Sequence, residues 1–377
     1  MPMLLLSNAV RMFVQSMEID NQGRMWIIDN GNTPNITVVP SSVPRICPPR
    51  LVIVDIATTA VIRSYTFDDA VANRTTSFLN DIVLDTTRGL AYISNTGGDG
   101  SLIVYSFSTN SARAFSGAST KSQPFASSTV INGLNYSFPF PVDTIALSAD
   151  TNTLYYGALG GYTMFAVPTA MLSNFSASVA AIDASVTAAF NRTSANGALT
   201  QCDGMTTSAQ GSFFYGSYGN AYEDSLVQRL PNGTLVQLYN NSKTMQWVDT
   251  FGWGGPGQLI FTSNRLQQFF AGTLNSTQTN FRLFSVVVPG QTSYLQAQAS
   301  PQTSQSQTTA AIPTTSIPAP SPTSAPPQSP PAPANSNAGS DSSGLSPGAI
   351  AGTVIGSVVG NNVTGSLCSY ARSCLIF

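Results

Sequence analysis

The sequence predicts an all-β fold, a β-propeller, on three observations. A unit of three short strands at residues 78–107 is repeated along the chain, and every copy except the first has an aspartate at the start of its first strand. A turn residue, glycine in most copies, follows eight positions after that aspartate. Helical periodicity is weak throughout, and residues 177–190 form the one segment that reads as a short helix. Small sheets of this kind hide their faces by packing around a common axis.

The unit at residues 78–107 serves as the template. Its strands are apolar or alternating and rich in β-forming residues, and tight turns at Thr86–Gly89 and Gly97–Gly100 separate them. Asp81 and Gly89 mark the unit. The other copies are marked by Gln15 with Gly23, Asp143 with Thr151, Asp203 with Gly211, and Asp249 with Gly257. Their spacing of 46 to 66 residues suits propeller blades joined by loops of variable length.

The repeated aspartates are the first candidates for function. In a propeller the first strand of each blade lines the axis, so Asp81, Asp143, Asp203 and Asp249 are expected to converge near one mouth of a central channel. Such a ring of oxygens could hold Ca²⁺ or pair with an ammonium group. The alternative is structural, because an aspartate at a strand start also satisfies backbone N–H groups in a turn.

The composition excludes several classes of protein. The chain of 377 residues has no histidine, so it cannot form a Ser-His-Asp triad or a histidine-ligated metal site by itself. Charged residues make up 8% of the chain and the net charge is −2, which argues against nucleic acid as a partner. Cys47 and Cys202 are either a disulfide or two buried thiols.

The chain divides into three parts. Residues 1–290 carry the strand units, whereas residues 291–343 are a Pro/Ser/Thr-rich stretch expected to be a disordered stalk. Residues 344–377 contain an apolar, glycine-rich run of about 15 residues, short of the ~20 that a membrane span needs. This last segment resembles a truncated membrane anchor and is a candidate tether.

Glycosylation sequons favour an extracellular or cell-surface protein. Most lie between expected strands, where a glycan could be accommodated. The candidate acceptors are Asn35, Asn73, Asn135, Asn174, Asn191, Asn232, Asn240 and Asn275, with a further sequon at Asn362. The first ten residues do not form a signal peptide, so either the protein is cytosolic or the chain is truncated at its N-terminus, and truncation is the simpler expectation.

Several landmarks resemble the major royal jelly protein and Yellow family. They occur in the family's order between residues 13 and 270 and include MEIDNQGRMWIIDNGN, CPPRLVIVDIATT and LIFTSNRLQQF. The resemblance implies a secreted six-bladed propeller, of which five modules are visible here and the first blade is expected to be incomplete. It also implies, for some members, dopachrome conversion and, for others, binding of biogenic amines in the channel.

These observations lead to a preferred function and two alternatives. The preferred one is a propeller that binds a small aromatic or amine ligand, with dopachrome-conversion-like isomerase activity as a candidate addition; no catalytic residue is assigned. The expected ligand-binding residues are Asn80, Asp81, Asp143, Asp203, Asp249 and Asn264. The alternatives are a Ca²⁺-dependent lactonase-like hydrolase, in which the metal activates water, and a non-catalytic adhesion module. No other cofactor is expected.

Overall fold

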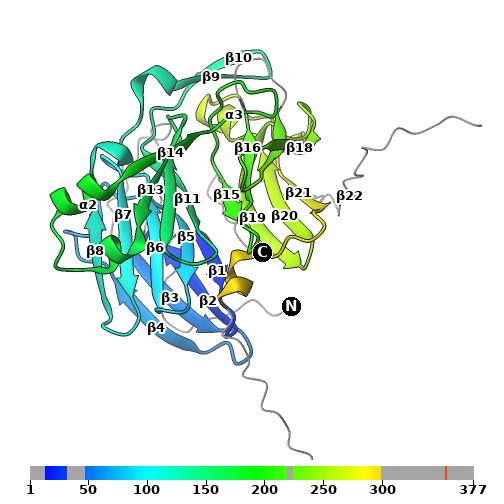
Figure 1. Ribbon diagram of the computed structural model, residues 1–377. Helices are drawn as coiled ribbons and strands as arrows, with labels where there is room; N and C mark the ends of the chain where they lie inside the picture. The colour runs from blue at the N-terminus through cyan, green and yellow to red at the C-terminus, as the bar shows by residue number, and fades with distance from the viewer. Residues whose placement is uncertain (1–12, 32–46, 219–223, 299–352, 355–377) are drawn as a thin grey trace, which may run out of the picture. The chain divides into compact units, whose positions relative to one another are not determined.

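The computed structural model describes residues 13–31, 47–218, 224–298 and 353–354. Five four-stranded antiparallel sheets follow one another along the chain, which confirms the predicted all-β propeller (Figure 1). Blade 1 consists of β1 (Val14–Ile19), β2 (Arg24–Asp29), β3 (Arg50–Asp55) and β4 (Val61–Thr66), and blade 2 consists of β5 (Leu79–Asp85), β6 (Leu90–Asn95), β7 (Ser101–Ser106) and β8 (Ser111–Phe115). Blade 3 consists of β11 (Val142–Leu147), β12 (Thr153–Ala158), β13 (Thr163–Pro168) and β14 (Thr187–Asn191), and blade 4 consists of β15 (Met205–Thr207), β16 (Phe213–Ser217), β17 (Ser225–Arg229) and β18 (Leu235–Asn240). Blade 5 consists of β19 (Trp247–Gly255), β20 (Gln258–Asn264), β21 (Arg282–Val287) and β22 (Thr353–Val354).

The turn between the first two strands has the same backbone in every blade. Gly23, Gly89, Gly211 and Gly257 have φ angles of 73°, 67°, 79° and 73°, and Thr151 takes the same left-handed conformation at 61°. A residue with a Cβ atom adopts this region at a cost, which explains why glycine fills the position in the other four copies. The repeat found in the sequence is therefore a repeat of backbone geometry.

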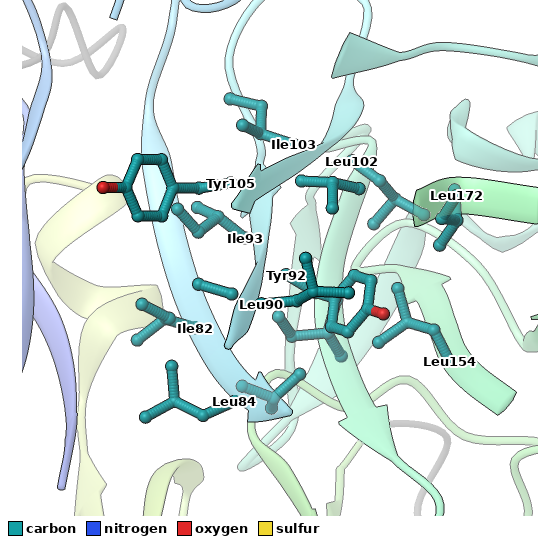
Figure 2. Close-up of a cluster of buried hydrophobic side chains, with 14 of the residues drawn as sticks. Ile82, Leu84, Leu90, Tyr92, Ile93, Leu102, Ile103, Tyr105, Leu154 and Leu172 are labelled. Atoms are coloured by element: carbon teal, nitrogen blue, oxygen red, sulfur yellow. The ribbon is translucent and has the colours of Figure 1, made fainter. Parts of the chain in front are cut away.

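Neighbouring blades pack face to face. The innermost strands contact each other in the order β1–β5, β5–β11, β11–β15 and β15–β19. Among the described residues, no comparably extensive contact joins β19 back to β1. Figure 2 shows side chains of the largest core cluster, where Leu84, Tyr92 and Tyr105 are almost completely buried. These three residues fill the space between blades, as expected for large apolar side chains.

Short elements connect the blades. Along the chain, the 3₁₀ turns η1 (Ala118–Thr120) and η2 (Pro124–Ala126) follow blade 2, and a hairpin of β9 (Ser128–Ile131) and β10 (Leu134–Ser137) comes next, before blade 3. Helices α1 (Thr169–Ser173) and α2 (Val179–Ser185) join β13 to β14, and α3 (Leu266–Phe270) follows β20. The helix expected over residues 177–190 is thus α2 in its first half, whereas its second half forms β14, the edge strand of blade 3.

Residues 288–298, here called the strap, leave blade 5 and contact blades 4, 2 and 1. The Ala209 amide donates to the Thr292 carbonyl at 2.8 Å, which ties the strap to a turn of blade 4. The strap then forms α4 (Tyr294–Ala297), where the Tyr294 hydroxyl accepts from the Leu84 amide of blade 2 at 3.0 Å. Gln298 adds a bond from its Nε2 to the Leu84 carbonyl at 3.0 Å. The strap therefore links blade 5 to blades 4 and 2 without joining a sheet.

The structure corrects some of the expectations, and others concern residues that it does not describe. Cys47 and Cys202 are not joined; Cys202 is a buried thiol between blades 3 and 4, and Cys47 precedes β3 in blade 1. Blade 1 has four strands, and the described sheets number five; the sixth blade implied by the resemblance is not among the described residues. The stalk lies outside the described residues, as does the apolar C-terminal segment apart from residues 353–354. None of the described helices is both long and apolar enough to cross a membrane.

Candidate functional site

Four aspartates from four blades form what we call the carboxylate ring: Asp81, Asp143, Asp203 and Asp249. Asp81 and Asp249 lie in the innermost strands β5 and β19, Asp143 lies in β11, and Asp203 directly precedes β15. Asp143 and Asp203 are buried, whereas Asp81 and Asp249 are half-buried. Each of these four carboxyl groups interacts electrostatically with at least one other, including Asp81 with Asp249 from blades 2 and 5. The repeat therefore brings the predicted side chains together.

Glycine allows the close approach of blades 4 and 5 at the ring. A Cβ atom at Gly204 would lie 1.2 Å from the carbonyl oxygen of Asp249. The residue after Asp203 therefore has no room for a side chain, and the backbone carrying Asp203 packs directly on the backbone carrying Asp249.

The hydrogen-bond donors to the ring are neutral. Ser16 Oγ donates to Asp81 Oδ1 at 3.1 Å, and the Trp247 indole N–H donates to Asp203 Oδ2 at 2.5 Å. Asp143 Oδ1 accepts from the Asn80 amide and from Thr96 Oγ1. Neutral donors orient a carboxylate but do not cancel its charge.

The carboxyl groups of the ring hold their protons unusually tightly. Burial raises the pKa of Asp81 to about 7, and burial together with the charges of Asp249 and Asp81 raises the pKa of Asp143 to about 8. Burial and the charges of Asp249 and Asp143 also raise the pKa of Asp203, and burial raises that of Asp249. Asp143 and Asp203 lie within hydrogen-bonding reach of each other, which requires one of the two to carry a proton.

The two predicted asparagines orient the ring. Asn80 accepts from Gln15 Nε2 at 3.1 Å while its own amide donates to Asp143, so it connects blades 1, 2 and 3. Asn264 donates from Nδ2 to Asp249 Oδ2 at 2.8 Å, and its Oδ1 accepts from the Leu266 amide. Both lie beside carboxyl groups, and their hydrogen bonds position those groups.

Sequence reasoning missed a fifth acidic residue. Glu18 lies two residues after Ser16 on β1 and interacts with Asp81. Burial and the Asp81 charge raise the pKa of Glu18 to about 8, and its carboxylate accepts a hydrogen bond from the Tyr294 hydroxyl. Glu18 does not occupy the repeated position, which Gln15 fills in blade 1, so the repeat could not identify it.

Aromatic side chains adjoin the ring on the side of Asp203. Trp247 is completely buried, and its ring stacks on Tyr218 with the centroids 4.8 Å apart. Phe138, which follows the β9–β10 hairpin, meets the Trp247 ring edge-on at 5.0 Å. The Tyr218 hydroxyl is buried and interacts with Asp203 and Asp143, yet it has no hydrogen-bond partner among the described residues. This hydroxyl was also missed, because Tyr218 follows β16 at a position with no counterpart in the repeat.

The arrangement suits a cation better than an anion. Its acidic groups converge, and its hydrogen-bond donors are already engaged by carboxylates. The rings of Trp247, Tyr218 and Phe138, here called the aromatic wall, lie beside them. Within the described ranges, no three Asp, Glu, Cys or His side chains are grouped so as to hold a metal ion.

Comparison with known proteins gives a family match over most of the described blades. The family model for the major royal jelly protein matches residues 12–291. Major royal jelly protein 3 of Apis mellifera is 24% identical over 295 residues, which cover 72% of this chain and 51% of the relative. Major royal jelly protein 2 of the same species is 24% identical over 297 residues, covering 72% and 61%. The chain thus spans about half to two thirds of the length of these relatives.

Solved structures give weaker similarities. A gluconolactonase from Xanthomonas campestris has a TM-score of 0.41 and 11% identity, over 66% of this chain and 69% of its own. A structural genomics protein of unknown function from Bacteroides thetaiotaomicron has a TM-score of 0.45 and 8% identity, over 74% of this chain and 56% of its own. At these scores the similarities carry no information about chemistry.

Proposed function

Because this chain belongs to the major royal jelly protein family, with a propeller fold, we propose that it binds a small organic cation at the carboxylate ring. The observation that carries the proposal is the convergence of Asp81, Asp143, Asp203 and Asp249 without a basic partner among the described residues. The five salt bridges of the described residues use other aspartates, namely Asp20, Asp29, Asp69, Asp85 and Asp99. An ammonium group would supply the missing positive charge and donate hydrogen bonds to the carboxylates.

The aromatic wall supports an amine with an apolar body. Trp247 and Tyr218 present stacked rings beside Asp203, and aromatic rings attract both flat apolar groups and ammonium groups. The Tyr218 hydroxyl gains a hydrogen-bond partner when a ligand with a polar group binds next to it. An aromatic amine combines these features.

Calorimetric titration with dopamine and serotonin tests the proposal. We expect saturable binding at one site per chain, and we expect the Asp203→Asn variant to weaken it by about tenfold or more, since a charge-assisted hydrogen bond is lost. Asp99→Asn is the matched control, because Asp99 is an exposed aspartate with its side chain 91% accessible. The proposal fails if folded protein gives no binding heat with either amine.

Proton transfer on a bound catechol derivative is the second candidate function. It is favoured by the Asp143–Asp203 pair, in which one carboxyl can donate a proton while the other accepts one. The decay of dopachrome, followed by absorbance, measures the activity. Asp143→Asn should abolish any acceleration over buffer, and an unaffected rate in that variant would remove the pair from the mechanism.

An extracellular location is part of the proposal. Asn73, Asn174, Asn232 and Asn275 are exposed sequon residues whose Oδ1 accepts from the backbone two residues later, which leaves the amide nitrogen to be modified. Asn135 and Asn191 are exposed as well, Asn240 is half-buried, and Asn35 lies outside the described residues. Expression in a secretory host followed by N-glycosidase treatment should lower the mass; an unchanged mass would oppose this location.

A further inference from the structure

The acidic groups at the axis extend along β1 beyond the carboxylate ring. Ser16 contacts Asp81, and Glu18 lies two residues further on the same strand. Alternate residues of a strand face the same side and lie roughly 7 Å apart. Glu18 is thus a fifth carboxyl group, two residues along β1 from the Ser16 that contacts the carboxylate ring. It lies next to Tyr294 of the strap.

No described cation balances these five groups. The described salt bridges all involve other carboxylates. Arg192 is buried nearby in the hydrogen-bond network, but its guanidinium donates to the carbonyl oxygens of Ala158 and Cys202. Burial, and after it the charges of neighbouring acidic groups, raise the pKa values of Asp143 and Glu18. The site therefore has more carboxyl groups than one ammonium group can pair with.

Tyr218 gives an independent sign that a ligand belongs here. Its side chain is 1% exposed, and its hydroxyl interacts electrostatically with Asp203 and Asp143 but has no hydrogen-bond partner in the described part of the chain. Burying an unpaired hydroxyl is unfavourable. A ligand bound among the acidic groups would supply the partner.

We propose that the site prefers a diamine or polyamine to a monoamine, with one ammonium group in the carboxylate ring and another at Glu18. This inference rests on the proposed binding of organic cations and names the ligand class. The acidic groups do not gather tightly enough to hold a metal ion within the described residues, so a compact divalent charge fits poorly. A flexible chain with separated ammonium groups distributes its charge along the axis, as the carboxyl groups are distributed.

Putrescine and butylamine form a matched pair of probes, because they share a four-carbon chain and differ by one amino group. Titration calorimetry at pH 8 in physiological salt should give putrescine an affinity about tenfold or more above that of butylamine. Spermidine should bind at least as tightly as putrescine. In the Glu18→Gln variant the ratio of the two affinities should fall towards one, while Asp99→Asn should leave the ratio unchanged.

The outcomes separate this inference from the proposed function. Equal affinities for putrescine and butylamine in the wild-type protein would overturn the diamine inference and leave cation binding intact. A preference for putrescine that survives Glu18→Gln would also overturn it, because the second ammonium group would then bind elsewhere. If neither these probes nor dopamine binds to folded protein, the proposed function itself fails. Circular dichroism of Glu18→Gln confirms that the variant is folded; the glutamine oxygen can still accept from Tyr294.

Discussion

The replacement Asp143→Asn should make the free energy of unfolding less dependent on pH. The asparagine keeps Oδ1 as the acceptor for Asn80 and Thr96, so the change removes a titratable group and spares these two bonds. In the wild-type protein the pKa of Asp143 rises from its ordinary value of 3.8 to about 8 on folding. A carboxyl group with a raised pKa favours folding while protonated. Its contribution is complete below pH 4 and is lost as the pH rises through about 8.

The magnitude follows from proton linkage. Between pH 5 and 7 this group is deprotonated in the unfolded chain and protonated in the folded one, which lowers stability by about 1.4 kcal/mol per pH unit. The wild-type protein should therefore lose about 3 kcal/mol more than Asp143→Asn over those two units.

Urea denaturation at pH 5, 6 and 7 measures both slopes. Asp99→Asn, on the exposed surface, serves as the control and should keep the wild-type slope. Equal slopes for wild type and Asp143→Asn would refute the reasoning, because they would show that Asp143 takes up no proton on folding.

Three further predictions concern the packing around the ring and the strap. Gly204→Ala should destabilise the protein by about 3 kcal/mol or more in urea denaturation, because the new Cβ would overlap the Asp249 carbonyl; Gly252→Ala, which meets nothing within 4 Å, should be neutral, and equal effects would contradict the close approach. Trp247→Phe should cost about 1–3 kcal/mol at pH 7, since Asp203 loses its indole donor; an unchanged midpoint would mean that the bond does not stabilise the fold. Tyr294→Phe should cost a similar amount and speed hydrogen exchange at the Leu84 amide, which loses its acceptor; the exposed Gln296→Ala on the same helix is the control, and protection that persists at Leu84 would count against the contact.

The repeated parts of the site could be predicted from the sequence. A blade needs a residue with a left-handed backbone conformation in the turn after its first strand, and glycine fills this position at Gly89, Gly211 and Gly257. The aspartates lie eight residues before this turn position, so their convergence follows from the symmetry of the fold. Thr151 shows that the position matters more than the residue type, because it adopts the same conformation with a side chain.

The unrepeated parts could not be predicted in this way. Glu18, Tyr218 and Tyr294 reach the ring or its neighbourhood from positions that have no equivalents in other blades. Their roles depend on which loop or strap approaches the axis, and that is set by packing between distant segments. The disulfide expectation was wrong for the same reason. Spacing along a chain does not bring Cys47 of blade 1 to Cys202, which packs against Arg192 beside blade 4.

The strap has a consequence for the order in which the protein can be completed during synthesis. Tyr294 and Leu84 are 210 residues apart in sequence, and Leu295 packs in the same core cluster as blades 1 to 3. The ribosome therefore finishes the inner strand of blade 2 long before it makes the residue that bonds to the end of that strand. Until then, the Leu84 amide of the nascent chain lacks the Tyr294 hydroxyl as its acceptor. Closing a loop of this length late favours folding after the last blade has emerged rather than blade by blade.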